Sequence, residues 1–328
     1  MEMRTLGQTD VEITPIGLGC WQMQRGKGMT GAMWSVLDQA TMDEIVAAAL
    51  RGGTTWFDTA QAYGNGASER ALSGALDRGG VAPGAVVVAT KWLPILKAAS
   101  DIPRTIGTRV ECLRPYPIDL FQVHIPWSRS PIKAQMREMA KLVRAGTVRA
   151  VGVSNFSARQ MHQAGAALQA EGLPLASNQV RINLLDRVIE TNGLLEMARR
   201  HKVTLIAYSP LAQGILTGRF HDDPSQVKRV SRGRRSRMSA SGRFLTPEGL
   251  AQSAPLIDEL RAVGEAHDAT PAEVALAWLV TYYGETVVAI PGASKPEHAA
   301  EAAAAMDVQL DEDELSRIDR LSAAIAKR

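Results

Sequence analysis

The chain has 328 residues, of which 45% are hydrophobic and 22% charged, proportions typical of a globular protein with a large core. A formal net charge of +3 is too small to indicate a nucleic-acid partner, and no apolar stretch reaches the ~18 to 20 residues that cross a membrane. Residues 1–10 hold no apolar signal core, and Cys20 and Cys112 lack the spacing of a metal or redox pair. We therefore expect a cytoplasmic protein with reduced cysteines and no disulfide or metal site.

In chain order, short β-rich runs alternate with amphipathic helical runs. Residues 4–6 and 11–13 flank a Gly-Gln-Thr-Asp turn and predict a hairpin. Eight apolar strands are predicted after it, at residues 16–19, 55–58, 86–91, 118–124, 148–154, 176–180, 204–209 and 287–291. Helices are predicted between them at residues 43–51, 68–76, 102–113, 132–145, 159–170 and 190–201. Two further helices precede the last strand, and helices from Pro296 and Asp311 end the chain.

Two capping boxes are predicted. Thr41 with Glu44 would open the first helix, and Thr270 with Pro271 and Glu273 would open the helix before the last strand. Residues 211 to about 253 are predicted to form a long loop.

This alternation predicts the fold class. Strands separated by helices pair in parallel, and eight such units close into a (β/α)8 barrel. No linker rich in Pro, Gly or Ser divides the chain. We therefore predict one domain over residues 1–328, a TIM barrel with an N-terminal β-hairpin and extra C-terminal helices.

A glycine pattern at Gly26-Lys-Gly28-Met-Thr-Gly31 matches the GxGxxG sequence of dinucleotide-binding folds. These glycines follow the first strand by about seven residues instead of ending it, and the next helix is predicted only from Asp43. Asp58, which would have to bind a ribose, lies 27 residues beyond Gly31. We interpret residues 26–31 as a substrate loop.

Four polar residues follow apolar strands of the predicted barrel. Asp58 ends the second strand with Tyr63 five residues later, Lys91 ends the third and His124 the fourth. Each residue alone has an ordinary interpretation, as a helix cap, a loop aromatic, a surface lysine or a core histidine. Because a barrel gathers the C-terminal ends of its strands around one mouth, the four are predicted to converge there.

The combined chemistry of these four residues suits the reduction of a carbonyl, which needs a hydride on carbon and a proton on oxygen. The Lys91 ammonium is expected to lower the pKa of Tyr63, which would act as the general acid. Asp58 is expected to pair with Lys91, and a neutral His124 to donate a hydrogen bond to the carbonyl oxygen.

The same residues carry a family resemblance. Phe57-Asp58-Thr59-Ala60, Tyr63-Gly64, Lys91 and His124 resemble the tetrad of the aldo-keto reductase superfamily. Further motifs of that superfamily follow in order, at Gly152-Val-Ser-Asn-Phe156, Asn178-Gln179, Tyr208-Ser-Pro-Leu211 and Ile290-Pro-Gly-Ala-Ser294. The resemblance covers nearly the whole chain and looks closest to bacterial reductases related to potassium-channel beta subunits. It implies an NADPH-dependent reductase of aldehydes or ketones.

The resemblance also implies an NADPH site extended across the barrel mouth. Ser154, Asn155 and Gln179 would bind the carboxamide, and Tyr208 would either stack on the nicotinamide or be a core tyrosine. The complete implied set is Gly19, Cys20, Trp21, Asp58, Ser154, Asn155, Gln179, Tyr208, Ser209, Pro210, Leu211, Gln213, Gly214, Arg219, Gly292, Ser294, Lys295, His298 and Glu301.

The phosphates of NADPH would be bound at two places. Residues 209–214 with Arg219 would hold the pyrophosphate, and Lys295, before a predicted helix N-terminus, the 2′-phosphate. Relatives often carry Gln, Glu and Asn in the adenine-binding helix, where this chain has His298, Glu301 and Ala302, so only Glu301 fits. A basic run follows the seventh strand, at Lys228, Arg229, Arg232, Arg234, Arg235 and Arg237. It is interpreted as a solvated loop or a phosphate contact, and the resemblance favours the phosphate.

The substrate site is predicted from aromatic residues. Trp21, Trp92 and Trp127 follow the first, third and fourth strands, and Met23 and Met29 lie in the first loop. They are interpreted either as packing residues or, with Tyr63 and His124, as walls of an adaptable apolar pocket. These loops carry no cluster of Arg or Lys, so we expect an apolar or aromatic carbonyl compound.

Two other functions are considered. An NADPH-binding regulatory or scaffold subunit with little turnover is the alternative, as the channel subunits illustrate. A metal-dependent hydrolase would need a cluster of His, Asp and Glu that the six histidines do not provide. The sequence indicates neither the physiological substrate nor self-association.

Overall fold

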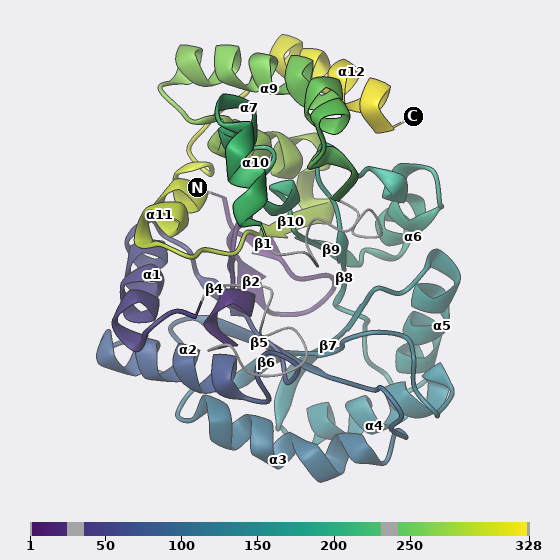
Figure 1. Cartoon of the computed structure of the whole chain (residues 1–328). Helices are drawn as coiled ribbons and strands as arrows, with labels where there is room; N and C mark the ends of the chain where they lie inside the picture. Colours follow the sequence, from purple (N-terminus) through teal and green to yellow (C-terminus); the bar gives the residue numbers. More distant parts are fainter. Residues whose placement is uncertain (1, 25–35, 231–241, 327–328) are drawn as a thin grey trace.

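The computed structural model describes residues 2–24, 36–230 and 242–326 (Figure 1). Eight parallel strands form one sheet in the order β10-β9-β8-β7-β6-β5-β4-β3. Their bounds are Leu18–Gly19 (β3), Trp56–Asp58 (β4), Val87–Trp92 (β5), Ile118–Val123 (β6), Val148–Ser154 (β7), Ser177–Arg181 (β8), Thr204–Tyr208 (β9) and Val287–Ile290 (β10). Parallel bridges from Ile16 to Ala289 and from Gly19 to Gly292 join the two outer strands, so the sheet curls into a barrel. The predicted (β/α)8 fold is confirmed.

Helices surround this barrel as an outer ring, which Figure 1 shows as ribbons on every side of the strands. They are Gln39–Arg51 (α1), Ala67–Arg78 (α2), Asp101–Leu113 (α3), Ile132–Arg144 (α4), Ala158–Gln169 (α5), Leu194–His201 (α6), Arg219–Asp222 (α7), Pro247–His267 (α9), Pro271–Tyr282 (α10), Pro296–Ala304 (α11) and Glu312–Ala326 (α12). None of the helices in the described ranges is both long and apolar enough to cross a membrane.

The structure corrects three element boundaries. Helix α1 begins at Gln39, because the Asp38 carboxylate caps it by accepting from the Thr41 N–H at 2.7 Å, so the predicted Thr41–Glu44 box is wrong. Helix α6 begins only at Leu194, because Gly193 has a φ of 78°. Residues 211–253 are not one loop, since they include α7 and the start of α9.

The predicted cap of helix α10 is confirmed. The Thr270 hydroxyl accepts from the Glu273 N–H at 3.2 Å, and the Glu273 carboxylate accepts from the Thr270 N–H at 2.7 Å. Pro271 occupies the first helical position, where its missing N–H costs no bond.

Two apolar cores lie on opposite sides of the barrel wall. The inner core joins alternate strand residues, such as Trp56, Leu120 and Ile206, to Leu6 and Ile13 from the hairpin. That hairpin consists of β1 (Arg4–Thr5) paired antiparallel with β2 (Glu12–Ile13), as predicted. It therefore fills the N-terminal end of the barrel.

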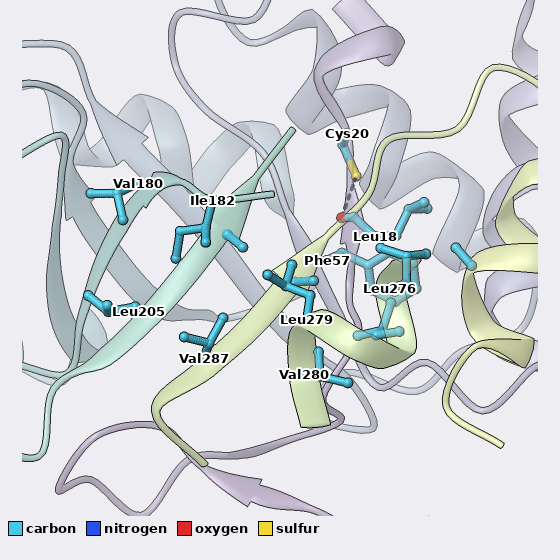
Figure 2. Packing of buried hydrophobic residues seen from close by; sticks show 14 of the residues in the cluster. Leu18, Cys20, Phe57, Val180, Ile182, Leu205, Leu276, Leu279, Val280 and Val287 are labelled. Atoms are coloured by element: carbon cyan, nitrogen blue, oxygen red, sulfur yellow. Dashed lines mark hydrogen bonds between the residues drawn. The ribbon is translucent and has the colours of Figure 1, made fainter. Parts of the chain in front are cut away.

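The outer core lies between the strands and the helices. Phe57, Phe121 and Leu205, each next in the chain to an inner residue, belong to it. Figure 2 shows Leu276, Leu279 and Val280 of α10 in one cluster with strand residues, Leu276 near Phe57 and Leu279 toward Val287 of β10. Because successive strand residues point to opposite faces, each strand contributes to both cores.

The same alternation directs polar side chains to the inside of the barrel at the C-terminal strand ends. Asp58, Lys91 and Gln122 each lie two residues beyond an inner-core residue, and all three are buried. Gly152 of β7 leaves space for the Gln122 side chain, since a Cβ at residue 152 would lie 3.0 Å from it and 2.3 Å from the Ser177 hydroxyl. A polar layer therefore caps the apolar interior and forms the floor of the barrel mouth.

Candidate active site

A cavity of about 690 Å³ opens at the C-terminal ends of the strands. It extends from the ends of β4 and β6, where Asp58, Tyr63 and His124 line it, to the region of Arg219 and helix α11. It therefore joins two predicted sites, the proposed reaction centre and the proposed phosphate site.

The Asp58 carboxylate is the centre of the buried polar layer. Its Oδ1 accepts a hydrogen bond from the Lys91 ammonium, and its Oδ2 accepts from the side-chain amides of Gln179 at 2.9 Å and Gln122 at 3.1 Å. Lys91 is wholly buried, and its Nζ also donates to the Thr59 carbonyl at 2.9 Å. The carboxylate balances the buried cation, which would otherwise be very costly.

The Tyr63 ring lies directly against this ion pair. The Lys91 Nζ is 5.1 Å from the Tyr63 ring centroid, and the Trp21 ring stacks on the Tyr63 ring at a centroid distance of 6.0 Å. Burial raises the pKa of the Tyr63 phenol well above its usual value, and the negative charge of Asp58 adds to this. The pKa of Tyr63 is therefore raised and not lowered as expected, because burial, which disfavours the charged phenolate, is the largest influence on it.

His124 forms the other side of the reaction centre. Burial lowers the pKa of its imidazole to about 3, and the nearby Lys91 charge contributes in the same direction. Its Nδ1 is buried and has no hydrogen-bond partner within the described part of the chain. The ring is therefore neutral at physiological pH and carries a single N–H that can donate.

Polar side chains continue this wall along the cavity from β7 to β9. The Asn155 amide donates to the Ser154 hydroxyl at 3.0 Å and to the His124 carbonyl at 3.2 Å, and its Oδ1 accepts from the Tyr208 hydroxyl at 3.0 Å. Asn155 has a φ of 61°, an uncommon value for a residue other than glycine. These bonds hold a strained residue in place, as is frequent at binding sites.

The loop after β9 combines strained backbone with a half-buried arginine. Ala212, Gln213 and Gly214 all have positive φ, and a Cβ on Gly214 would lie 2.7 Å from the Arg219 guanidinium. The Arg219 Nε is buried without a hydrogen-bond partner among the described residues, and burial lowers its pKa. A half-buried guanidinium that lies 4.6 Å from the Phe220 ring centroid, and whose Nε has no hydrogen-bond partner among the described residues, is suited to an anion entering the cavity.

The far end of the cavity is formed by helix α11. His298, Glu301 and Ala302 line it, and the Glu301 carboxylate accepts from the Thr270 hydroxyl at 2.7 Å. The Ser294 hydroxyl and the His298 Nδ1 lie 3.4 Å apart. Lys295 caps this helix but is exposed and does not line the cavity.

Nearly all residues predicted from the sequence line this one cavity. The predicted residues that do not line it are Lys91, which lies beneath the floor, Met23, which is buried in the outer core, Trp92, Trp127 and Lys295. Trp92 points outward into the helix layer, where its indole N–H donates to Asp101 at 2.9 Å. Trp127 is 72% exposed. The structure therefore gives no pocket role to these two tryptophans.

Other residues line the mouth although the sequence did not single them out. Gln61, Leu93, Ile95, Lys97 and Ile125 come from the loops after β4, β5 and β6. Their only signal in the sequence was their position after strands that end in polar residues.

Some sequence predictions lie outside the described residues. These are the glycine pattern at residues 26–31, Met29, and the arginines at 232, 234, 235 and 237. Lys228, also in the basic run, is exposed. Within the described ranges, no three His, Cys, Asp or Glu side chains are grouped as a metal ion would require.

Comparisons with known proteins agree with this geometry. The model of the aldo/keto reductase family matches residues 15–323. An uncharacterised oxidoreductase of Mycobacterium tuberculosis is 36% identical over 301 residues, covering 91% of this chain and 86% of that protein. The aldo-keto reductase YhdN of Bacillus subtilis is 35% identical over 231 residues, covering 68% of this chain and 66% of that protein.

Two solved structures resemble the whole chain. The glycerol dehydrogenase AKR11B4 of Gluconobacter oxydans superposes with a TM-score of 0.81 at 28% identity, covering 99% of this chain and 96% of that one. The thermostable aldo-keto reductase Tm1743, solved with the inhibitor epalrestat, gives 0.75 at 29% identity, covering 98% and 100%.

Proposed function

The chain belongs to the aldo/keto reductase family, and on that premise we propose that it reduces aldehydes or ketones to alcohols with NADPH, using Tyr63 as the general acid. One observation carries the proposal. Tyr63 lies between the buried Lys91–Asp58 pair and a neutral His124, at the edge of a cavity that also reaches an unpaired arginine.

Tyr63 is suited to deliver the proton. Its raised pKa keeps the phenol protonated at neutral pH, so the proton is present when a carbonyl oxygen arrives. As negative charge develops on that oxygen, it becomes more basic than a phenolate and takes the proton. Lys91, 5.1 Å from the ring centroid, then stabilises the phenolate until solvent restores its proton.

His124 is proposed to orient the carbonyl. A neutral imidazole donates a hydrogen bond without competing with Tyr63 as an acid. Its T-shaped contact with Tyr63, at an interplanar angle of 85°, places both rings at the same part of the cavity wall. The two donors would therefore act on one oxygen.

The cavity suits a nicotinamide dinucleotide. When bound, the reduced nicotinamide supplies the hydride to the carbonyl carbon and is itself oxidised. Ser154, Asn155 and Gln179 would hold the carboxamide, and Tyr208 would lie along the ring. Arg219 supports this proposal independently, because its buried, unpaired Nε suits the pyrophosphate.

The preference for NADPH over NADH rests on helix α11. Its N-terminus favours an anion, and Lys295 adds a positive charge there. Lys295 is exposed, so we propose that it reaches the 2′-phosphate from the rim of the cavity. His298 and Glu301 would contact the adenosine.

The substrate is proposed to be a compound with an apolar or aromatic body. Trp21, Leu93, Ile95 and Ile125 line the mouth near Tyr63. Flat and branched apolar side chains accept varied shapes, which favours a broad substrate range. We also propose that residues 1–328 act as one domain, and that the free thiols of Cys20 and Cys112 reflect a reducing compartment such as the cytoplasm.

The test is NADPH oxidation by the purified protein with a panel of aromatic and aliphatic aldehydes and ketones. Steady turnover that requires the Tyr63 hydroxyl is expected. Tight NADPH binding without turnover on any compound would contradict the proposal and indicate a regulatory or scaffold subunit instead.

A further inference from the structure

Lys97 is a charged residue in an otherwise apolar part of the mouth. It follows β5 in the chain and lines the same cavity as Tyr63 and His124. Its neighbours in that lining include Leu93, Ile95 and Ile125. A charged side chain among apolar ones at the mouth of a reaction cavity is suited to fix the orientation of a ligand.

The backbone around Lys97 is held firmly by the next loop. Its carbonyl accepts from the Ser128 hydroxyl and from the Arg129 N–H, both at 2.9 Å. Its own N–H donates to the Pro94 carbonyl at 2.9 Å, and Leu96 between them has a φ of 58°. The ammonium is therefore presented from a fixed backbone, which lowers the entropic cost of using it.

The charge of Lys97 is only partly neutralised. Its Nζ lies 3.3 Å from Asp101 Oδ2, the oxygen that also accepts from the Trp92 indole. Asp101 pairs through Oδ1 with Arg104 as well, so within the described residues one carboxylate serves two cations. Since an ammonium has three donors, Lys97 can bind a second anion without leaving Asp101.

Acidic groups do not oppose such an anion from the cavity wall. Among the described residues that line the cavity, the carboxylates are Asp58 and Glu301. Asp58 is paired with Lys91, and Glu301 is bonded to Thr270 at the α11 end. The substrate end of the cavity therefore has an excess of positive charge.

We propose that the preferred substrates carry a carboxylate at the end opposite the carbonyl, and that Lys97 binds it. The apolar side chains would enclose the body of the molecule, with the carbonyl at Tyr63 and His124. This inference rests on the proposed function and narrows its substrate to aldehydes or ketones with an apolar middle and an anionic tail. No charge selection was expected from the sequence, because these loops carry no cluster of basic residues, and Lys97 on its own would supply that selection.

The experiment compares 4-carboxybenzaldehyde with its methyl ester, which has the same aldehyde and ring but no charge. The ratio of their kcat/KM values, at saturating NADPH, isolates the carboxylate. The wild type is expected to prefer the acid, and Lys97→Met to lower the ratio about tenfold, the size of one charge-assisted contact. Lys97→Arg should retain most of this preference. Added salt should reduce the ratio in the wild type and in Lys97→Arg, but not in Lys97→Met.

Lys141→Met is the matched control. Lys141 pairs with Glu138 at 2.7 Å, its side chain is 60% exposed and it does not line the cavity, so the ratio should stay unchanged. A ratio that Lys97→Met leaves at the wild-type value, while the ester is still reduced, would overturn this inference alone. Failure of the wild type to oxidise NADPH with either compound would refute the proposed function, and this inference with it.

Discussion

The imidazole of His124 meets the phenol of Tyr63 edge to face, with the ring centroids 5.7 Å apart. The pKa values of the two side chains are shifted in opposite directions. Burial raises the pKa of the tyrosine and lowers that of the histidine to about 3. Both therefore stay uncharged at neutral pH, beside the buried Lys91–Asp58 pair. In the proposed reaction this separation would give each group one task, proton delivery for Tyr63 and hydrogen bonding for His124.

Replacing Tyr63 with Phe should lower kcat by about 10² to 10⁴, the usual contribution of a positioned general acid. The ring and its packing against Trp21 are retained, so the dissociation constant of NADPH, measured by fluorescence, should change little. Tyr116→Phe is a suitable control, because that tyrosine donates to the Val81 carbonyl at 2.7 Å and does not line the cavity. Near-normal turnover of the Tyr63 variant would exclude the acid role.

Acid should destabilise the protein in part through His124. The folded pKa of about 3 lies below the unfolded value of about 6.5, so the unfolded chain binds more protons between these values. The share of the unfolding free energy due to His124 therefore falls as the pH drops through that window, by at most roughly 1.4 kcal/mol per pH unit.

Urea unfolding of the wild type and of His124→Gln at about pH 4 and pH 7 measures this share. The variant should lose less stability on acidification than the wild type. Equal losses would show that His124 is not the neutral, buried group described above. The kcat/KM of the wild type should correspondingly show no step near pH 6.5, the ordinary pKa of histidine.

Two substitutions separate the phosphate contacts. Arg219→Met should weaken NADPH and NADH alike, by about tenfold or more, because both carry the pyrophosphate. Lys295→Ala should weaken NADPH far more than NADH, because only NADPH carries the 2′-phosphate. Isothermal titration calorimetry measures the dissociation constants of both cofactors. If Lys295→Ala weakens NADPH and NADH binding equally, Lys295 does not contact the 2′-phosphate.

Substitutions of two tryptophans should affect different properties, stability for Trp92 and activity for Trp21. Trp92→Phe removes the hydrogen bond to Asp101 and is expected to lower the unfolding free energy by about 1 to 3 kcal/mol, with kcat/KM nearly unchanged. Trp21→Ala should lower kcat/KM about tenfold, because the Trp21 ring stacks on Tyr63 and lines the cavity. A large loss of activity in Trp92→Phe would return that residue to the substrate pocket.

The strand ends and the polar residues on them could be predicted from the sequence because both depend on local pattern. The position of Trp92 was predictable too, since it directly follows Lys91 and strand neighbours point to opposite faces. Trp92 was nevertheless assigned to the substrate pocket, because aromatic side chains often form pocket walls. That prediction was wrong. Trp127 was assigned to the pocket for the same reason and is exposed on the surface.

Other features depend on contacts between distant parts of the chain, which no local pattern reports. The pKa of Tyr63 depends first on burial, to which the rings of Trp21 and His124 from other loops contribute, and then on the charge of Asp58. The charge of Lys97 at the mouth depends on Asp101 serving two cations. The start of α6 could have been predicted from local sequence, because Gly193 directly precedes it. The positive φ of that glycine was not anticipated.

Arg4 in the first strand donates to the Val287 carbonyl at 2.5 Å and to the Val280 carbonyl at 2.8 Å. The hairpin that fills the barrel can therefore make these hydrogen bonds only when β10, 283 residues later in the chain, has formed. A growing polypeptide must carry Leu6 and Ile13 uncovered until synthesis is nearly complete, and contacts of such long range form slowly. Fragments that stop before α10 should consequently aggregate, whereas the finished protein should fold as a single cooperative unit.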